Sequence, residues 1–68
     1  MTATGVNLTA REVEVLCRIA GGASNDAIAA DLTLSARTVE RHTSNIYAKL
    51  NVHNRVEAAN WARAHGVG

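Results

Sequence analysis

The stretch Ser35–Leu50, with the sequence SARTVERHTSNIYAKL, has the pattern of an amphipathic helix with two different faces. Ser35 is a favourable N-cap, because its hydroxyl oxygen can accept a hydrogen bond from a first-turn N–H. At about 100° per residue, one side is the apolar stripe of a core-facing helix, formed by Val39, Thr43, Ile46 and Leu50. The opposite side carries polar or small residues: Arg37, Glu40, Arg41, Ser44, Asn45 and Ala48. This second face is either an ordinary solvated surface or a binding surface.

The residues just before this stretch favour binding. Ser24 can cap a short helix over about residues 25–31, in which Ala29 is small enough for close approach of a crossing helix. Thr33 and Leu34 leave little room for a loop before the next N-cap. Two helices joined by three or four residues form a helix-turn-helix unit, whose second helix can lie in the DNA major groove.

A further helix is predicted at each end of the chain. Thr9 with Glu12 three residues later has the pattern of a capping box, and Gly21-Gly22 should end that helix, with one glycine left-handed. Its expected inward residues are Val13, Leu16, Cys17 and Ala20, with Val15 and Ile19 widening the stripe. Asn54 and Glu57 repeat the capping pattern for the last helix, and Gly66 is a natural C-terminal cap.

Together these signals predict an all-α domain. The chain has 68 residues, no proline and no phenylalanine, so its small core must be built from closely packed aliphatic residues. We expect a compact four-helix bundle containing a helix-turn-helix, with helices at about residues 10–20, 25–31, 36–50 and 55–65. Residues 1–6 have nothing to bury and are expected to be a disordered tail or linker remnant, which leaves residues 7–68 as the domain.

Three blocks occur in the order and spacing of a known family. They are LTAREVEVL, GGASNDAIAADLTLSARTVERHTSNIYAKLNV and NRVEAANWARAHG, and they extend from about Asn7 to Gly66. The chain resembles the LuxR-type (GerE-like) helix-turn-helix DNA-binding domains of bacterial transcriptional regulators. The resemblance implies a cytoplasmic C-terminal output domain that needs no cofactor, binds double-stranded DNA and has RNA polymerase as a further candidate partner.

The resemblance also implies roles for individual residues. Positions matching the family's base-contacting set are Arg37, Glu40, Arg41 and Ser44. Positions matching or adjoining the backbone-contacting set are Ser24, Asn25, Thr38, Asn45, Lys49 and Arg55. The chain departs from the family at Asp26 and Ala27, where Lys and Glu are usual, and at Glu40, where Lys is frequent. Glu40 could accept a hydrogen bond from cytosine, or it could simply pair with Arg37 or Ser44.

In LuxR-type domains the fourth helix is commonly the dimer contact. The matching outward residues of this chain are Val56, Ala59, Asn60 and Arg63. The resemblance therefore implies a homodimer on DNA and an inverted-repeat site. The structural alternative is a weakly amphipathic surface helix without a partner.

Charge and composition limit the other classes of function. The formal net charge is only +1, but residues 34–55 carry four basic residues against one acidic residue, while residues 8–32 carry two against four. The basic part coincides with the expected recognition helix. With no convergent nucleophile and base, no metal-ligand spacing and one cysteine, Cys17, which we expect to be buried, the chain is predicted to be neither an enzyme nor a metal-binding protein. No apolar run is long enough to span a membrane. The main alternative is a helical protein-interaction module with weak or no DNA binding.

Overall fold

The structure is a computed structural model that describes residues 7–67, in which four helices and no strand are present. The helices are α1 (Ala10–Ala20), α2 (Asn25–Leu32), α3 (Ala36–Leu50) and α4 (Arg55–Ala64). The predicted all-α class and helix order are confirmed, although α2 is one residue longer and α4 one residue shorter than predicted. The predicted tail, residues 1–6, lies outside the described residues. Within residues 7–67, no helix combines the length and apolar character needed to cross a membrane.

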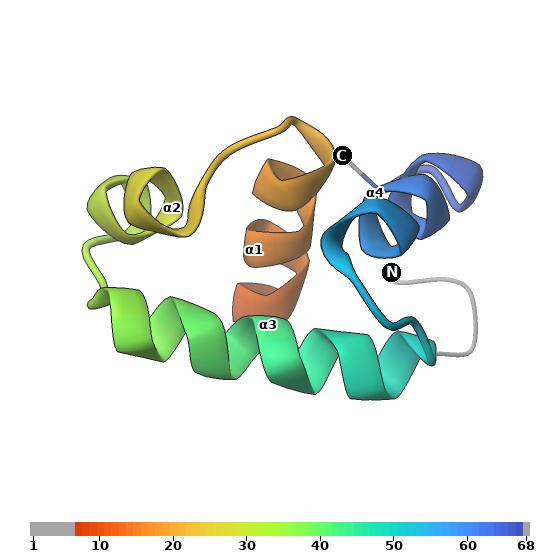
Figure 1. The fold of residues 1–68 in the computed structure, drawn as a ribbon, viewed down its shortest axis with the longest axis horizontal. Helices are drawn as coiled ribbons and strands as arrows, with labels where there is room; N and C mark the ends of the chain where they lie inside the picture. Colours follow the sequence, from red (N-terminus) through yellow and green to blue (C-terminus); the bar gives the residue numbers. More distant parts are fainter. Residues whose placement is uncertain (1–6, 68) are drawn as a thin grey trace.

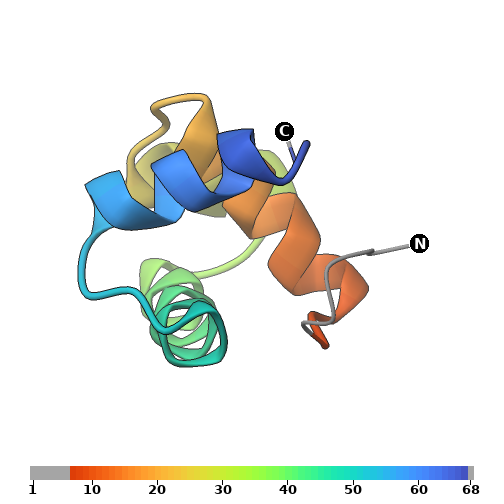
Figure 2. The same cartoon turned by 90° about the vertical axis from the view of Figure 1, so that its right-hand side faces the viewer.

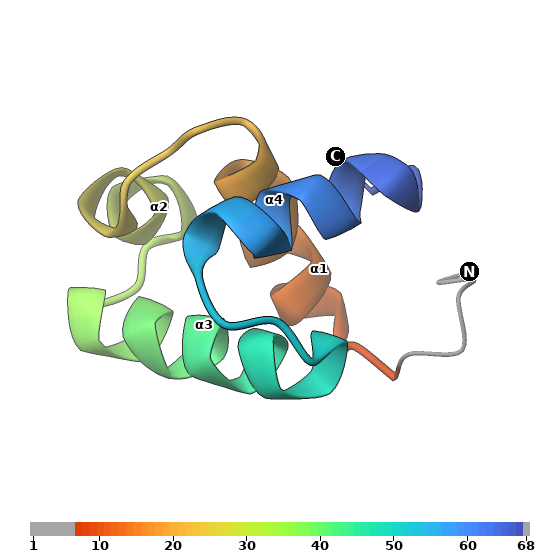
Figure 3. The same ribbon diagram turned by 45° about the vertical axis from the view of Figure 1, so that its right-hand side comes forward.

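Helix α3 forms one edge of the domain. In Figure 1 it runs along the bottom, and the other three helices all lie above it. Helix α1 crosses it near the middle, with α2 towards one end and α4 towards the other. Figure 2 looks nearly along α3, and Figure 3 shows α4 passing in front of α1, so both views leave the same side of α3 uncovered. No other described element covers that side.

Each helix begins at a polar side chain that caps its first turn. The caps Thr9, Ser24, Ser35 and Asn54 each accept a hydrogen bond from the backbone N–H three residues later. The reciprocal half of the capping box is present in α1, where Glu12 accepts from the N–H of Thr9 at 2.9 Å. In α4 the expected box is wrong in detail. Glu57 accepts from the N–H of His53 at 2.8 Å, one residue before the cap, so it ties the preceding link to the helix instead.

Each helix ends in the same kind of turn. One residue adopts a left-handed conformation, and the next N–H donates to the carbonyl five residues earlier over 2.7 to 3.0 Å. The left-handed residues are Gly22, Thr33, Asn51 and Gly66. The two glycines confirm the sequence prediction. Asn tolerates this conformation, but Thr33 is β-branched and its φ of 58° is strained. The strain lies in the tight turn between α2 and α3.

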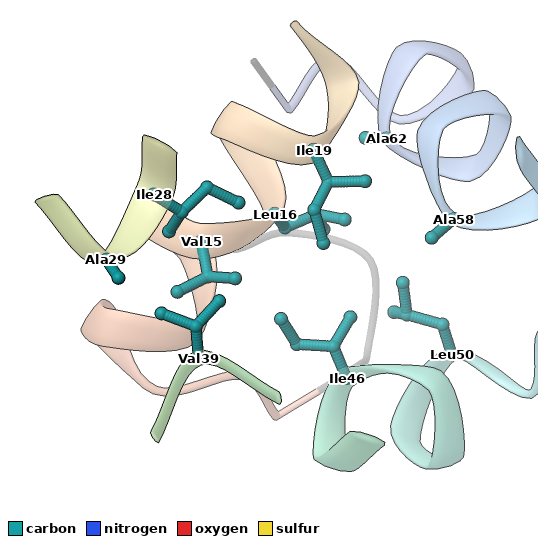
Figure 4. Close-up of a cluster of buried hydrophobic side chains, with 10 residues drawn as sticks. All are labelled: Val15, Leu16, Ile19, Ile28, Ala29, Val39, Ile46, Leu50, Ala58 and Ala62. Atoms are coloured by element: carbon teal, nitrogen blue, oxygen red, sulfur yellow. The ribbon is translucent and has the colours of Figure 1, made fainter. Parts of the chain in front are cut away.

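The core is a small set of aliphatic side chains contributed by all four helices (Figure 4). Its members are Val15, Leu16, Ile19, Ile28, Ala29, Val39, Ile46, Leu50, Ala58 and Ala62. The predicted buried stripe of α3 is confirmed in full, including Thr43. Thr43 is the polar member of this stripe, and its buried hydroxyl has no hydrogen-bond partner among the described residues.

The predicted inward face of α1 is rotated from the observed one. Val13 and Cys17 are only half-buried and lie outside the core, and Ala20 packs at its edge. The buried face is centred on Val15 and Ile19, because α1 lies between α3 on one side and α4 on another and buries a wider arc than one stripe. The prediction of a buried Cys17 is therefore wrong.

Candidate nucleic-acid interface

The uncovered side of α3 carries all four residues predicted to contact bases. Arg37, Glu40, Arg41 and Ser44 are exposed, whereas the stripe on the opposite side of α3 is buried. The capping of α3 by Ser35 fixes where this face begins, since the Ser35 hydroxyl accepts from the N–H of Thr38 at 3.1 Å. A rigid helix therefore presents a continuous polar surface, which we call the α3 outer face.

The charged residues of the α3 outer face are unpaired within the described part of the chain. Within residues 7–67, no ion pair or hydrogen bond engages the side chains of Arg37, Glu40 or Arg41. The pairing of Glu40 with Arg37 or Ser44, one of the two outcomes considered from the sequence, does not occur here. These side chains are available for an external ligand.

The other basic residues are all engaged within the domain. Arg11 pairs with Glu14 at 3.2 Å, and Arg18 pairs with Asp31 and donates to the carbonyl of Glu14. Arg63 donates to the Ala20 carbonyl at 3.1 Å and to the Asn60 amide oxygen at 3.3 Å. Lys49 and Arg55 also have internal partners. Of the seven basic residues, Arg37 and Arg41 are the two without a partner in the described part of the chain.

Lys49, expected at the DNA backbone, lies at the end of α3 beside the start of α1. Its ammonium is 2.7 Å from the Glu12 carboxylate, whose side chain is only 5% exposed. Burial acts to raise the pKa of Glu12, but the hydrogen bonds from Lys49 and from the N–H of Thr9 outweigh it and hold that pKa below its ordinary value. Lys49 itself is 37% exposed, so the ammonium keeps access to solvent.

The residues expected at the start of α2 are also held by internal bonds. The Ser24 hydroxyl accepts from the N–H of Ala27 at 3.1 Å. The Asn25 amide oxygen accepts from Arg55 at 3.0 Å, and the same guanidinium donates to the carbonyl of Ala23 at 2.6 Å. Thr38 lies in the first turn of α3, and its hydroxyl is 2.9 Å from that of Ser35, the cap of α3. Asn45 is exposed on α3.

The outer side of α4 has the exposure expected of a contact surface. Val56 is 69% exposed and is the large apolar side chain most open to solvent in the described residues. Asn60 and Arg63 are exposed beside it, whereas Ala59 is half-buried against the core. These residues line a shallow depression together with Ile19, Gly22 and Arg55. Because Arg63 is bonded to its own chain, its charge is partly satisfied before any partner arrives.

The described residues do not group the side chains that a metal site or a catalytic site would need. Within residues 7–67, no three His, Cys, Asp or Glu side chains lie close enough to bind one metal ion. His65 instead stacks on Trp61, with the ring centroids 3.9 Å apart. The half-buried Cys17 lies next to Arg63 in a shallow surface pocket without a second nucleophile or base.

Comparison with known proteins gives a consistent result. The family model described as bacterial regulatory proteins of the luxR family matches residues 6–62. The chain is 45% identical over 58 residues to the fimbriae Z protein of Salmonella typhimurium, and this match covers 85% of this chain and 28% of that protein. It is 53% identical over 55 residues to the transcriptional regulatory protein YhcZ of Bacillus subtilis, and this match covers 81% of this chain and 26% of that protein.

A solved structure shows the same fold. The response regulator ChrA of a heme-sensing two-component system superimposes with a TM-score of 0.85 at 38% identity. The match covers 100% of this chain and 34% of that one. The chain thus spans about a quarter to a third of the length of the proteins it matches.

Proposed function

Because the chain belongs to the luxR family of bacterial regulatory proteins and is a helix-turn-helix DNA-binding domain of that family, we propose that it recognises a specific double-stranded DNA sequence. It would do so as the C-terminal output domain of a longer, cytoplasmic transcriptional regulator that acts on RNA polymerase. In this proposal α3 enters the major groove and its outer face reads base edges. The phosphate backbone fixes the orientation of the domain.

The observation that carries the proposal is the distribution of unpaired charge. Five basic side chains are engaged in internal bonds, and the two that are not, Arg37 and Arg41, lie one turn apart on the α3 outer face. The guanidinium groups of Arg37 and Arg41 are therefore open to an external ligand. Phosphates and guanine edges are ligands for which unpaired guanidinium groups are suited.

Each residue of the outer face has a defined chemistry towards bases. Arg37 and Arg41 can each donate two hydrogen bonds to guanine O6 and N7. Glu40 can accept from cytosine N4, and its lack of an internal partner favours this role over simple pairing. Ser44 can donate or accept. The Glu40 carboxylate would also repel phosphate, so it should reduce nonspecific affinity and sharpen discrimination between sequences.

The proposed backbone contacts flank this face. Ser24 and Asn25 lie at the start of α2, and Thr38 and Asn45 lie on α3. Lys49 has three N–H donors, of which Glu12 takes one, so its ammonium can still donate to a phosphate. Arg55 is the least available of the set, because two of its donors are used internally.

Recognition of an inverted repeat requires two copies of the domain. We propose that α4 forms the contact, with Val56, Asn60 and Arg63 exposed and Ala59 at the base of the surface. The available apolar surface is small, so the domain should be monomeric in dilute solution and dimeric on DNA.

A salt titration of duplex binding tests the proposal against the alternative of a protein-interaction module. Counterion release makes the affinity of a DNA-binding domain fall steeply with salt concentration. We expect this steep dependence, and selection from a random duplex pool should return one sequence with two-fold symmetry. A folded domain that shows neither specific nor salt-dependent duplex binding would contradict the proposal.

A further inference from the structure

Arg55 joins α4 to the start of α2. Within residues 7–67 it makes the one side-chain hydrogen bond between these two helices, from Nη1 to the Asn25 Oδ1 at 3.0 Å. Its Nη2 donates to the carbonyl of Ala23 at 2.6 Å. The two acceptors lie on either side of Ser24, the cap of α2. A planar guanidinium with its donors in a fixed fork can hold two such acceptors at once.

This bond determines how the Asn25 amide is oriented. Arginine has donors and no acceptor, so the amide atom that faces Arg55 has to be the oxygen. The amide nitrogen, Nδ2, then has two hydrogens to donate, and it has no acceptor among the described residues. Asn25 is half-buried, so the amide keeps contact with solvent. The Arg55 bond therefore orients a hydrogen-bond donor at the first residue of α2, and this N-terminal end of α2 is expected to approach the DNA backbone.

We propose that Arg55 is the positioning residue that orients the Asn25 amide, so that Nδ2 makes the phosphate contact proposed above for Asn25, and that Arg55 is not itself a phosphate ligand. The inference rests on the proposed function, because it requires duplex DNA beside α2. The charged Arg55 orients the amide through its two N–H donors, and the neutral Asn25 makes the contact with phosphate.

Asn25→Asp separates DNA binding from structural support. An aspartate offers Arg55 a charged acceptor, which gives a stronger bond than the amide oxygen, and a negative charge suits the first turn of α2. Stability to urea should therefore be unchanged or higher. Because the Nδ2 donor is lost and a carboxylate faces the phosphate, duplex affinity should fall at least tenfold. Because the new carboxylate also repels DNA by its charge alone, the neutral Asn25→Ala has to weaken duplex binding as well for the amide to be the phosphate ligand.

Arg55→Lys tests whether the fork or the charge of Arg55 matters. Lysine keeps the charge but cannot hold Asn25 and Ala23 in the same geometry. We expect it to weaken duplex binding about as much as Asn25→Ala, by about ten- to a hundredfold, the range for a lost hydrogen bond to a charged group. The slope of affinity against salt should not change, and the double variant should bind no more weakly than the weaker single variant.

Arg18→Lys is the matched control, because Arg18 also bonds a side chain and a backbone carbonyl, at Asp31 and Glu14, without adjoining Asn25. It should bind DNA like the wild type, and circular dichroism should confirm the fold of every variant. Arg55 would instead be a phosphate ligand if Arg55→Lys bound DNA with wild-type affinity while Arg55→Gln bound more weakly and with a shallower salt slope. Additive single effects would also overturn the inference. Absence of salt-dependent binding by the wild type would instead refute the proposed function.

Discussion

Lys49, in the last turn of α3, lies 2.7 Å from the carboxylate of Glu12, in the first turn of α1, across 37 residues of sequence. The same oxygen of Glu12 accepts the N–H of Thr9 at 2.9 Å. One buried carboxylate thus caps α1 and anchors the far end of α3 to it. The ion pair thus adds to the core packing of α3 a direct link between its last turn and the first turn of α1.

Acidification should weaken the fold through Glu12. Its folded-state pKa lies below the ordinary value of 4.5, because the hydrogen bonds from Lys49 and Thr9 outweigh the effect of burial. A depressed pKa contributes stability that is fully present above the unfolded value, near 4.5, and is lost as the pH falls through the folded value. Urea unfolding at a series of pH values should show the wild type losing stability below that pH more steeply than Glu12→Gln. Parallel curves would count against this role.

Lys49→Ala should affect both folding and DNA binding. It leaves a buried carboxylate without its cation, and we expect a loss of about 1.5–3 kcal/mol in the free energy of unfolding, as for hydrogen bonds to charged groups. If the exposed ammonium also contacts phosphate, the salt slope should become shallower by about one unit on every duplex. Arg11→Ala is the control, because its pair with Glu14 is exposed and should be worth under about 1 kcal/mol. An unchanged salt slope would leave Lys49 with a structural role alone.

The local features of the fold were accessible from the sequence. N-caps such as Ser35 and the apolar stripe of α3 depend on residues a few positions apart, and periodicity predicts these directly. The rotated face of α1 was not accessible in this way, since it depends on which neighbouring helices α1 meets. The left-handed Thr33 was missed as well, because β-branched residues rarely adopt that conformation.

The candidate site was only partly accessible for a related reason. Arg41 and its neighbours follow from helical phase, because a residue opposite the buried stripe must be exposed. The roles of Lys49 and Arg55 depend on partners 37 and 30 residues away, and no periodic signal connects such residues. In the sequence all these side chains look like free cations. The structure separates the two unpaired arginines from those that hold the helices together.

Thr33→Gly should stabilise the domain. A left-handed conformation costs a non-glycine residue about 1–2 kcal/mol, and the greater unfolded-state entropy of glycine offsets about 0.5–1 kcal/mol of the gain. We expect a net increase of up to about 1.5 kcal/mol in the free energy of unfolding, measured with urea, and unchanged DNA affinity. Asn51→Gly is a suitable comparison, since Asn51 has the same φ of 58° but tolerates it better, and it should gain less. A destabilised Thr33→Gly would show that the Thr33 side chain contributes more than its strain costs.

Arg41→Ala should reduce sequence discrimination. Losing a two-bond contact with guanine should cost about 1–3 kcal/mol on the selected site and relax the preference at one base pair. Binding to scrambled duplexes should change much less. The measurement is a competition titration of the wild type and the variant on both duplexes at one salt concentration. Equal weakening on both would assign Arg41 to the phosphate backbone.

Val56→Glu should separate half-site binding from cooperative loading. Val56 is 69% exposed at the second position of α4, where an acidic residue suits the helix N-terminus, so the fold should be preserved. Across a two-fold axis through α4, two such carboxylates would lie close together and repel. Band-shift titrations should then show unchanged binding to a half-site and loss of cooperativity on the full palindrome.

A charge-swapped pair makes this assignment sharper. Val56→Lys alone should also lose cooperativity, because two ammonium groups repel in the same way as two carboxylates. An equal mixture of Val56→Glu and Val56→Lys would place opposite charges across the axis, so cooperative loading of one copy of each should return. This rescue cannot come from a general change in DNA affinity, since each variant alone carries its own charge to the DNA. Cooperativity that persists in the folded Val56→Glu variant, or fails to return in the mixture, would place the dimer contact on a surface other than α4.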